Sequence, residues 1–258
     1  MISSPRAWTL EQNDRRLVFS TGAGATLFAE SGGSRVARHH HPAWKVVLPI
    51  GGHVRITQAG RPPLSAAGLV VPPQLTHTCA VTSPYAALFV DPWQLHAATG
   101  LVRLDAGAVR RLLAALGPTD ADGLGTAAGD LTAACSELTA LTGAAPVPRL
   151  DERVAHAVRT AGLSGPDGTI GELAAEVGLS PSRLRALVRE SVGIPLVRLR
   201  QWGRLRNAIA DLPRTSVAAA AAAAGFADQA HLTRTSRTLL GRTPASLGRA
   251  SVAVFSLS

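Results

Sequence analysis

The chain has 258 residues and a mass of 26.6 kDa, which is enough for about two domains. Its 2 cysteines are too few for a disulfide framework or a structural zinc site, and no apolar run is long enough to span a bilayer. The 26 basic residues outnumber the 17 acidic ones and leave a net charge of +9, which favours a polyanionic partner such as nucleic acid.

The first hundred residues carry short β-prone runs that are each bounded by Gly, Pro or Ser. The runs are Leu17–Phe19, Thr26–Phe28, Trp44–Leu48, His53–Thr57, Gly68–Val71 and Ala86–Val90. This spacing is typical of an all-β barrel or sandwich, so we predict a β domain over residues 1–100.

Two stretches of this β domain lead into histidines. In the first, Gly33 is followed after five residues by His39, His40 and His41, and in the second a strand and a double-proline corner precede His77. Both stretches resemble the paired motifs of cupins, which are small double-sheet barrels, although the second match is looser. The resemblance implies a cupin-like β-barrel with an effector pocket.

In metal-binding cupins, two histidines and a glutamate of the first motif and one histidine of the second are the ligands. By position these are His39, His41 and His77 here, with Lys45 where the glutamate belongs. Three neutral imidazoles can hold zinc, nickel or copper with a water in the open position, but the lysine ammonium repels a cation. The alternatives are a pocket in which Lys45 pairs with an anionic organic effector, and histidines that merely lie in turns or on the surface.

Residues 101–142 are predicted to be helical, in two segments, Leu104–Leu116 and Leu124–Leu141. Leucines recur along one stripe of each segment, at near-heptad spacing in the second. Such helices either pack on their own barrel or form a dimer interface. Residues 143–150, which include two prolines, read as a linker between domains.

Residues 151–250 hold 14 arginines and 8 acidic residues, a net charge of +6, against +3 for residues 1–150. Within them, Ile170–Val177 has apolar residues at helical spacing, and Gly178 makes a turn. Ser180 and Pro181 then open a second helix as its N-cap and first residue. This order of helix, glycine turn and helix predicts a helix-turn-helix unit.

The same arrangement occurs again about 45 residues later in the chain. Ser216–Ala224 contains seven alanines and favours a helix, and Gly225 ends that helix. Asp228 is a suitable N-cap for a second helix that runs to about Leu240. Two helix-turn-helix units in one basic region indicate DNA binding.

With these two units, residues 169–249 resemble the DNA-binding domain of the AraC/XylS family of bacterial transcription regulators. The matching residues are Leu173, Ala174, Gly178, Leu179, Ser180, Leu184, Gly193, Arg204, Leu205, Ala208, Leu212, Gly225, Phe226, Asp228, Arg234, Gly241 and Pro244. The resemblance implies a linker helix over about Pro195–Leu212. It also favours the dimer interpretation of residues 101–142, because resembling regulators dimerise through two helices after the cupin.

The second recognition helix departs from the family at several positions. Leu232, Ser236 and Leu240 stand where Phe or Tyr is usual, and Gly248 replaces an arginine. Because the small Ser236 side chain leaves space unfilled, we expect a less rigid second unit.

The resemblance places base-reading positions on both recognition helices. They are Ser182, Arg183, Arg185 and Ala186 in the first and Gln229, Ala230, His231 and Arg234 in the second, while Arg189, Arg204 and Arg237 are the expected phosphate contacts. Arg suits guanine, Gln suits adenine, and His can donate to a purine acceptor.

The predicted fold class is α+β with two domains: a cupin-like β-barrel with two following helices, and an all-α domain with two helix-turn-helix units joined by a linker helix. The domains are residues 1–100, 101–142, 143–150 and 151–250, with a tail at 251–258. We expect a cytoplasmic, homodimeric transcriptional activator that binds double-stranded DNA, contacts RNA polymerase and responds to a small molecule or a metal. It is not expected to bind membranes or to be an enzyme. The alternatives are a metal-dependent cupin enzyme with a DNA-binding appendage, and an architectural DNA-binding protein without an effector.

Overall fold

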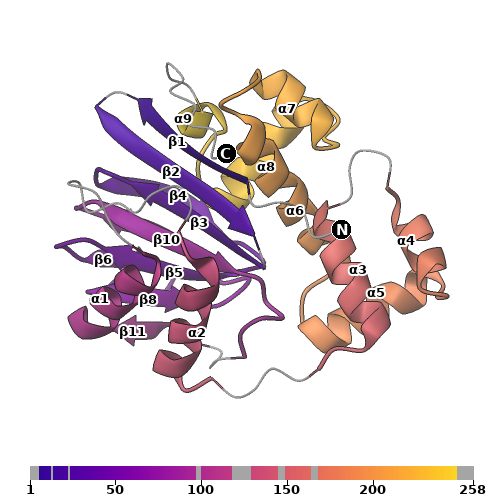
Figure 1. Ribbon diagram of the computed structural model, residues 1–258, viewed down its shortest axis with the longest axis horizontal. Coiled ribbons are helices and arrows are strands. Elements are labelled where there is room, and N and C mark those ends of the chain that lie inside the picture. The colour runs from indigo at the N-terminus through magenta and orange to yellow at the C-terminus, as the bar shows by residue number, and fades with distance from the viewer. Residues whose placement is uncertain are drawn as a thin grey trace.

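The computed structural model describes residues 6–248 except 13, 23, 97–99, 118–128, 145–148 and 164–167. The described part of the chain forms an N-terminal domain of strands and two helices, up to residue 144, and a helical C-terminal domain from residue 149 (Figure 1). Leu124, the two prolines of the predicted linker and the tail 251–258 lie outside the described residues.

Two antiparallel sheets build the N-terminal domain. The seven-stranded sheet runs in the order β1 (Arg6–Gln12), β2 (Arg15–Gly22), β3 (Ala25–Glu30), β10 (Tyr85–Val90), β5 (Trp44–Pro49), β8 (Gly68–Val71) and β11 (Val102–Leu104). The four-stranded sheet runs in the order β4 (Ser34–His39), β9 (His77–Val81), β6 (Val54–Thr57) and β7 (Leu64–Ala66). All six predicted β runs coincide with strands, except that His53 lies one residue before β6. The segment 101–142 was expected to be helical only, and this is wrong for β11, a three-residue strand whose pairing with β8 leaves no periodic pattern in the sequence.

The central strands of the larger sheet are buried on both faces. Along β10, Tyr85, Ala87 and Phe89 face the smaller sheet, and the residues between them face the opposite layer. That opposite layer consists of α1 (Ala106–Ala115) and α2 (Leu131–Thr142). Continuous apolar runs in β5 and β10 follow from this double burial.

The leucine stripes of α1 and α2 pack on the sheet of the same chain. Leu112 and Leu138 are 0 % exposed, and Leu116 and Leu131 are also buried in that layer. These leucines therefore offer no free surface to a second copy of the chain. Both cysteines are free thiols; Cys79 is buried and Cys135 is half-buried.

The C-terminal domain has two helix-turn-helix units on either side of a linker helix. Its helices are α3 (Glu152–Leu163), α4 (Ile170–Glu176), α5 (Pro181–Val192), α6 (Leu196–Asp211), α7 (Val217–Ala223), α8 (Gln229–Leu240) and α9 (Ala245–Gly248). We call α4 and α5 the first unit, and α7 and α8 the second unit. The caps are as predicted: the side chains of Ser180 and Asp228 accept from the first-turn amides of α5 and α8.

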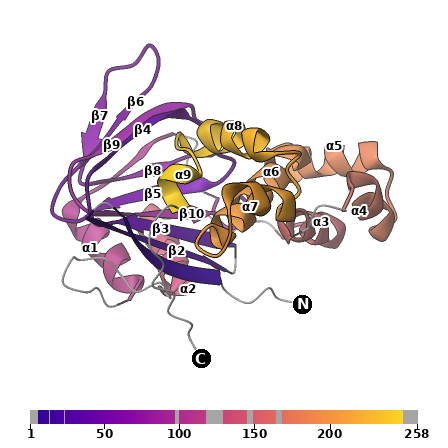
Figure 2. The same cartoon turned by 90° about the horizontal axis from the view of Figure 1, so that it is seen from above.

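The two units have different surroundings. The first unit packs with α3 and the start of α6 in a separate core, against which Trp93 of the N-terminal domain also packs, and it projects away from the sheets (Figure 2). The second unit lies against the N-terminal domain together with α9 (Figure 2). The core between the two sheets continues into the C-terminal domain, through Trp202, Leu205 and Ile209 of α6 and Leu232 and Leu239 of α8. The two domains thus share one core.

Ser236 does not leave the space that the sequence suggested. Its side chain is 0 % exposed, and its hydroxyl donates to the carbonyl of Arg242 at 2.7 Å. The chain after α8 therefore folds back onto Ser236 and satisfies its buried hydroxyl. Within the described ranges, no helix is long and apolar enough to cross a bilayer.

Candidate nucleic-acid interface and effector site

The first recognition helix, α5, presents the predicted residues to solvent. Ser182, Arg183, Arg185, Ala186 and Arg189 are all exposed. The opposite side of the helix is fixed by Leu184 and Val188, each 0 % exposed in the core of the first unit. A rigid helix with an arginine-rich free face is suited to major-groove reading.

The second recognition helix, α8, offers a comparable face. Gln229, Ala230, Arg234 and Arg237 are exposed and line an open hollow on its surface. His231 is less free, because its ring meets the Phe226 ring edge-on with the centroids 5.2 Å apart, and its Nδ1 accepts the amide of Ala227 at 3.4 Å. Only its Nε2–H is left to donate to a base.

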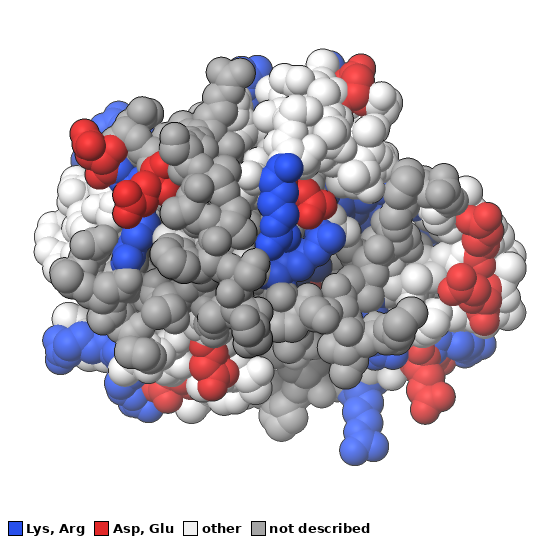
Figure 3. Space-filling view, turned by 45° about the horizontal axis from the view of Figure 1, so that its top comes forward, with Lys and Arg blue, Asp and Glu red and all other residues white. Residues whose placement is uncertain are grey.

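Arg204 lies on α6 and differs from the other predicted phosphate contacts. It is half-buried, and its Nε has no hydrogen-bond partner among the described residues. Arg200 has a buried Nε in the same condition, and burial together with the charge of Arg204 lowers its pKa. Two neighbouring cations with unsatisfied donors are a place for an anion such as a phosphate. On the face in Figure 3, basic and acidic side chains are scattered rather than gathered in one field.

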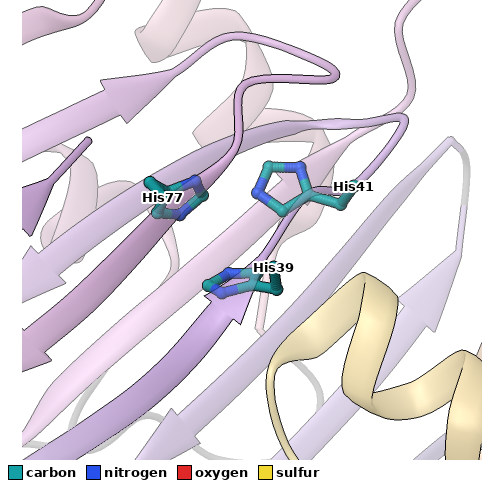
Figure 4. Close-up of side chains that lie close together, drawn as sticks. All are labelled: His39, His41 and His77. Atoms are coloured by element: carbon teal, nitrogen blue, oxygen red, sulfur yellow. The ribbon is translucent and has the colours of Figure 1, made fainter. Parts of the chain in front are cut away.

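The structure brings together His39, His41 and His77, which we call the histidine cluster (Figure 4). His39 ends β4, His41 lies in the connection to β5, and His77 begins β9. Each Nδ1 lies 2.7–2.9 Å from a backbone carbonyl two residues away, of Ala37, Ala43 and Leu75 respectively. These bonds place a proton on Nδ1 and leave the lone pair on Nε2 in all three rings.

Burial keeps the histidine cluster neutral. Desolvation first, and then the charge of Lys45, lower the pKa of His77 to about 3 and hold the pKa values of His39 and His41 well below their ordinary value. Burial also lowers the pKa of Lys45, whose Nζ lies 3.3 Å from the Nε2 of His39.

These residues fit a metal ion. One nitrogen from each ring lies within 4.8 Å of the others, and the Nε2 atoms of His41 and His77 are buried without a hydrogen-bond partner among the described residues. The carbonyls hold the rings in the orientation and tautomer that metal ligands need. Bound there, a divalent transition metal would supply a Lewis acid or an open coordination position.

A second site lies between the domains and was not predicted. We call it the interdomain cavity, and its volume is about 60 Å³. Its walls come from Lys45, Tyr85 and Phe89 on the N-terminal side and from Trp202, Arg206 and Arg242 on the C-terminal side. Lys45 is therefore shared, whereas the three histidines lie behind it and do not line the cavity.

Buried ion pairs join the domains beside this cavity. Arg242 bonds Glu30 at 2.9 Å, and the Tyr85 hydroxyl donates to the same carboxylate at 2.9 Å. Arg206 bonds Asp91 at 3.0 Å, with side chains that are 14 % and 4 % exposed. The sequence signal for these ion pairs is a single carboxylate within or directly after an apolar strand, Glu30 in β3 and Asp91 after β10, because a buried acid requires a partner.

The C-terminal sequence matches a known family, and the fold matches known structures. Residues 173–250 match the model described as "Helix-turn-helix domain". An apo form of ToxT from Vibrio cholerae aligns with a TM-score of 0.52 and 9% identity over 88% of this chain and 97% of that chain. ToxT of the same organism bound to an unsaturated fatty acid aligns with a TM-score of 0.51 and 10% identity over 95% of each chain. The AraC-like transcriptional activator CuxR aligns with a TM-score of 0.39 and 17% identity over 76% and 81% of the two chains. A comparison with curated protein sequences finds no match.

Proposed function

We propose that this chain is a DNA-binding transcriptional regulator of the AraC family and that an effector that binds between its domains controls it. The helix-turn-helix match and the two-domain fold support this proposal. The observation that carries the proposal is the docked second unit, whose α8 shares its core with the N-terminal sheets. A ligand at that contact acts on DNA binding because one recognition helix is part of it.

The chemistry of the interdomain cavity favours an amphipathic carboxylate. Three cationic side chains, Lys45, Arg206 and Arg242, lie in walls that are otherwise mostly apolar. Arg206 and Arg242 already have carboxylate partners, so Lys45 is the cation that an effector carboxylate can pair with. The similar fold of ToxT is known with an unsaturated fatty acid and with an arylbutenoic acid bound, which supports this class of ligand.

The size of the cavity indicates how such an effector acts. A volume of about 60 Å³ holds only a few water molecules, whereas pockets for drug-sized ligands are typically several hundred Å³. A larger carboxylate therefore has to displace α6 or the second unit from the sheets. The effector and the docked arrangement compete, and binding releases the second unit for DNA.

Oleate and its methyl ester test the effector proposal on the full chain. Genome-wide mapping of bound sites first supplies the operator, and its affinity is then measured by fluorescence anisotropy in about 0.15 M salt against random DNA. We expect oleate to change operator affinity and the ester, which lacks the charge, to leave it unchanged. Lys45→Met should abolish the oleate response. An equal response to acid and ester would contradict a role for Lys45.

The remaining features are proposals of the same kind. We propose that the chain acts as an activator through contact with RNA polymerase and binds its operator as a homodimer, which repeated half-sites in the mapped operator would support. The enzyme alternative predicts oxygen uptake by metal-loaded protein, and we expect none, because the histidine cluster has Lys45 in place of a carboxylate ligand.

A further inference from the structure

The histidine cluster contains three acceptors and only one nearby donor. All three Nδ1 atoms are committed to backbone carbonyls, so each ring turns a lone pair toward the other two. Lys45 reaches the Nε2 of His39, whereas those of His41 and His77 have no partner among the described residues. Burying a hydrogen-bond acceptor without a donor costs free energy. Two such acceptors beside a third indicate that the cluster holds a ligand, because the single ammonium of Lys45 satisfies only one of the three.

The strand β4, which ends at His39 of this cluster, is also the strand against which the second unit docks. The backbone amide of His40 donates to the carbonyl of Thr238, near the end of α8, at 3.0 Å. Gly241, the residue that ends α8, lies so close to β4 that a Cβ there would come within 2.5 Å of the Ala37 carbonyl oxygen and 3.0 Å of His39 Nδ1. The Ala37 carbonyl that touches the recognition helix is the one that orients His39.

We propose that the histidine cluster binds a divalent transition-metal ion in exchange for the Lys45 ammonium, and that the second unit senses this exchange through β4. An all-imidazole ligand set selects zinc, nickel, copper or cobalt over magnesium and calcium, which prefer oxygen. Metal binding itself stands on the cluster alone; its consequence for DNA rests on the function proposed above.

The exchange follows from charge. A dication held by the three Nε2 atoms lies within a few ångströms of the Lys45 Nζ, which is 3.3 Å from the Nε2 of His39. Because both are buried, they repel strongly, and the lysine moves toward the interdomain cavity that it already lines. In the cavity the Lys45 ammonium comes closer to Arg206 and Arg242 on the C-terminal side of the interface. Repulsion between these positive charges loosens the docked second unit.

Cobalt titration of the full chain, prepared with chelator and then freed of it, tests the site. Bound Co²⁺ gives visible absorption bands that report its ligands, and competition with Zn²⁺ gives relative affinity. We expect His77→Ala to weaken Zn²⁺ binding by about tenfold or more, and Lys45→Met to strengthen it by about tenfold or more. His53→Ala is the matched control, since His53 is exposed and outside the cluster.

Lys45→Met guards against misfolding, because a gain of affinity cannot come from a damaged fold. Zn²⁺ affinity that is unchanged in Lys45→Met, or lost equally in His53→Ala and His77→Ala, overturns the proposal. So does the absence of Co²⁺ bands in the wild-type chain.

Hydrogen exchange tests the coupling. Zn²⁺ should raise exchange in residues 36–41 and 229–241 of the wild-type chain but not in His77→Ala, because His77 is on β9 and leaves the α8–β4 contact intact. No zinc-dependent change at these segments would overturn the coupling. The operator affinity of the metal-free chain is measured in parallel. A chain that binds its operator but no metal refutes this inference alone. A chain that binds metal but shows no preference for the operator refutes the proposed function alone.

Discussion

The two helix-turn-helix units are built alike and used differently. Both recognition helices begin at a side-chain N-cap and end at a left-handed glycine, Gly193 with φ 74° and Gly241 with φ 69°. Nothing lies within 4 Å of a Cβ built on Gly193, whereas one built on Gly241 meets β4. The same local motif is therefore free in one copy and docked in the other.

Their interiors show the same difference. Eight residues after the N-cap, the first unit has Val188 and the second has Ser236, and both are 0 % exposed. The first unit completes its core with α3 and the start of α6, while the second does so with the rest of α6 and the sheets of the N-terminal domain. A unit that lacks a full core of its own depends on what it is docked to, and this dependence is what makes it controllable.

The largest expected effect comes from removing the ion pair between the domains. Arg206→Met leaves Asp91 buried without a charged partner, which costs about 3–5 kcal/mol while the domains stay docked. The free energy lost in Arg206→Met cannot exceed the free energy of docking between the domains, because Asp91 becomes hydrated once the domains separate. Exchange of the His40 amide, protected through Thr238, measures that docking. Arg214→Met, on an exposed arginine, should leave it unchanged.

Alanine substitutions at the glycines that end the two recognition helices test whether only the second unit is docked. Gly193→Ala should cost about 1–2 kcal/mol, the price of a left-handed non-glycine residue in open space. Gly241→Ala has the same backbone cost and in addition drives its Cβ into the Ala37 carbonyl, so α8 must leave β4. Thermal unfolding and His40 exchange report the two effects. Equal behaviour of the two variants would show that the second unit is not held at Gly241.

Base reading by α8, but not by α5, should depend on the effector that binds beside the N-terminal domain. Arg185→Ala is expected to cost about 1–3 kcal/mol on the operator and to relax preference at one base pair, equally with and without effector. The cost of Arg234→Ala should change with effector, because its helix is the docked one. Arg189→Ala, a phosphate contact, should weaken all sequences alike. The measurement is anisotropy on single-base operator variants, and identical specificity profiles for Arg185→Ala and Arg189→Ala would contradict these roles.

The smallest effect concerns Tyr85, the only tyrosine of the chain, which lies under the second unit. Burial raises the pKa of Tyr85 above its ordinary value. Stability from this group is complete below the unfolded pKa of about 10 and falls above it by about 1.4 kcal/mol per pH unit. Tyrosinate absorbance and unfolding curves from pH 9 upward measure this, and Tyr85→Phe should remove this contribution. Titration of native Tyr85 near its ordinary pKa would mean that the interface is open.

Much of the site could be read from the sequence. The caps, the glycine turns and, apart from the half-buried His231, the exposed faces of α5 and α8 were predicted, and so was the gathering of His39, His41 and His77. Arg206 and Arg242 were not, because an arginine on a helix or in a turn looks the same whether it faces solvent or a buried carboxylate. The buried leucines of α1 and α2 face their own sheet, so dimerisation through residues 101–142 stays a prediction.

The sequence by itself determined the two DNA-binding units, since caps, turns and helical periodicity act within a few residues. Only the tertiary structure decided that the second unit is docked, because that contact joins residues as distant as Glu30 and Arg242, which are 212 positions apart. Complementary surfaces at such separation are recognised by shape and charge in three dimensions, and short-range patterns carry no trace of them.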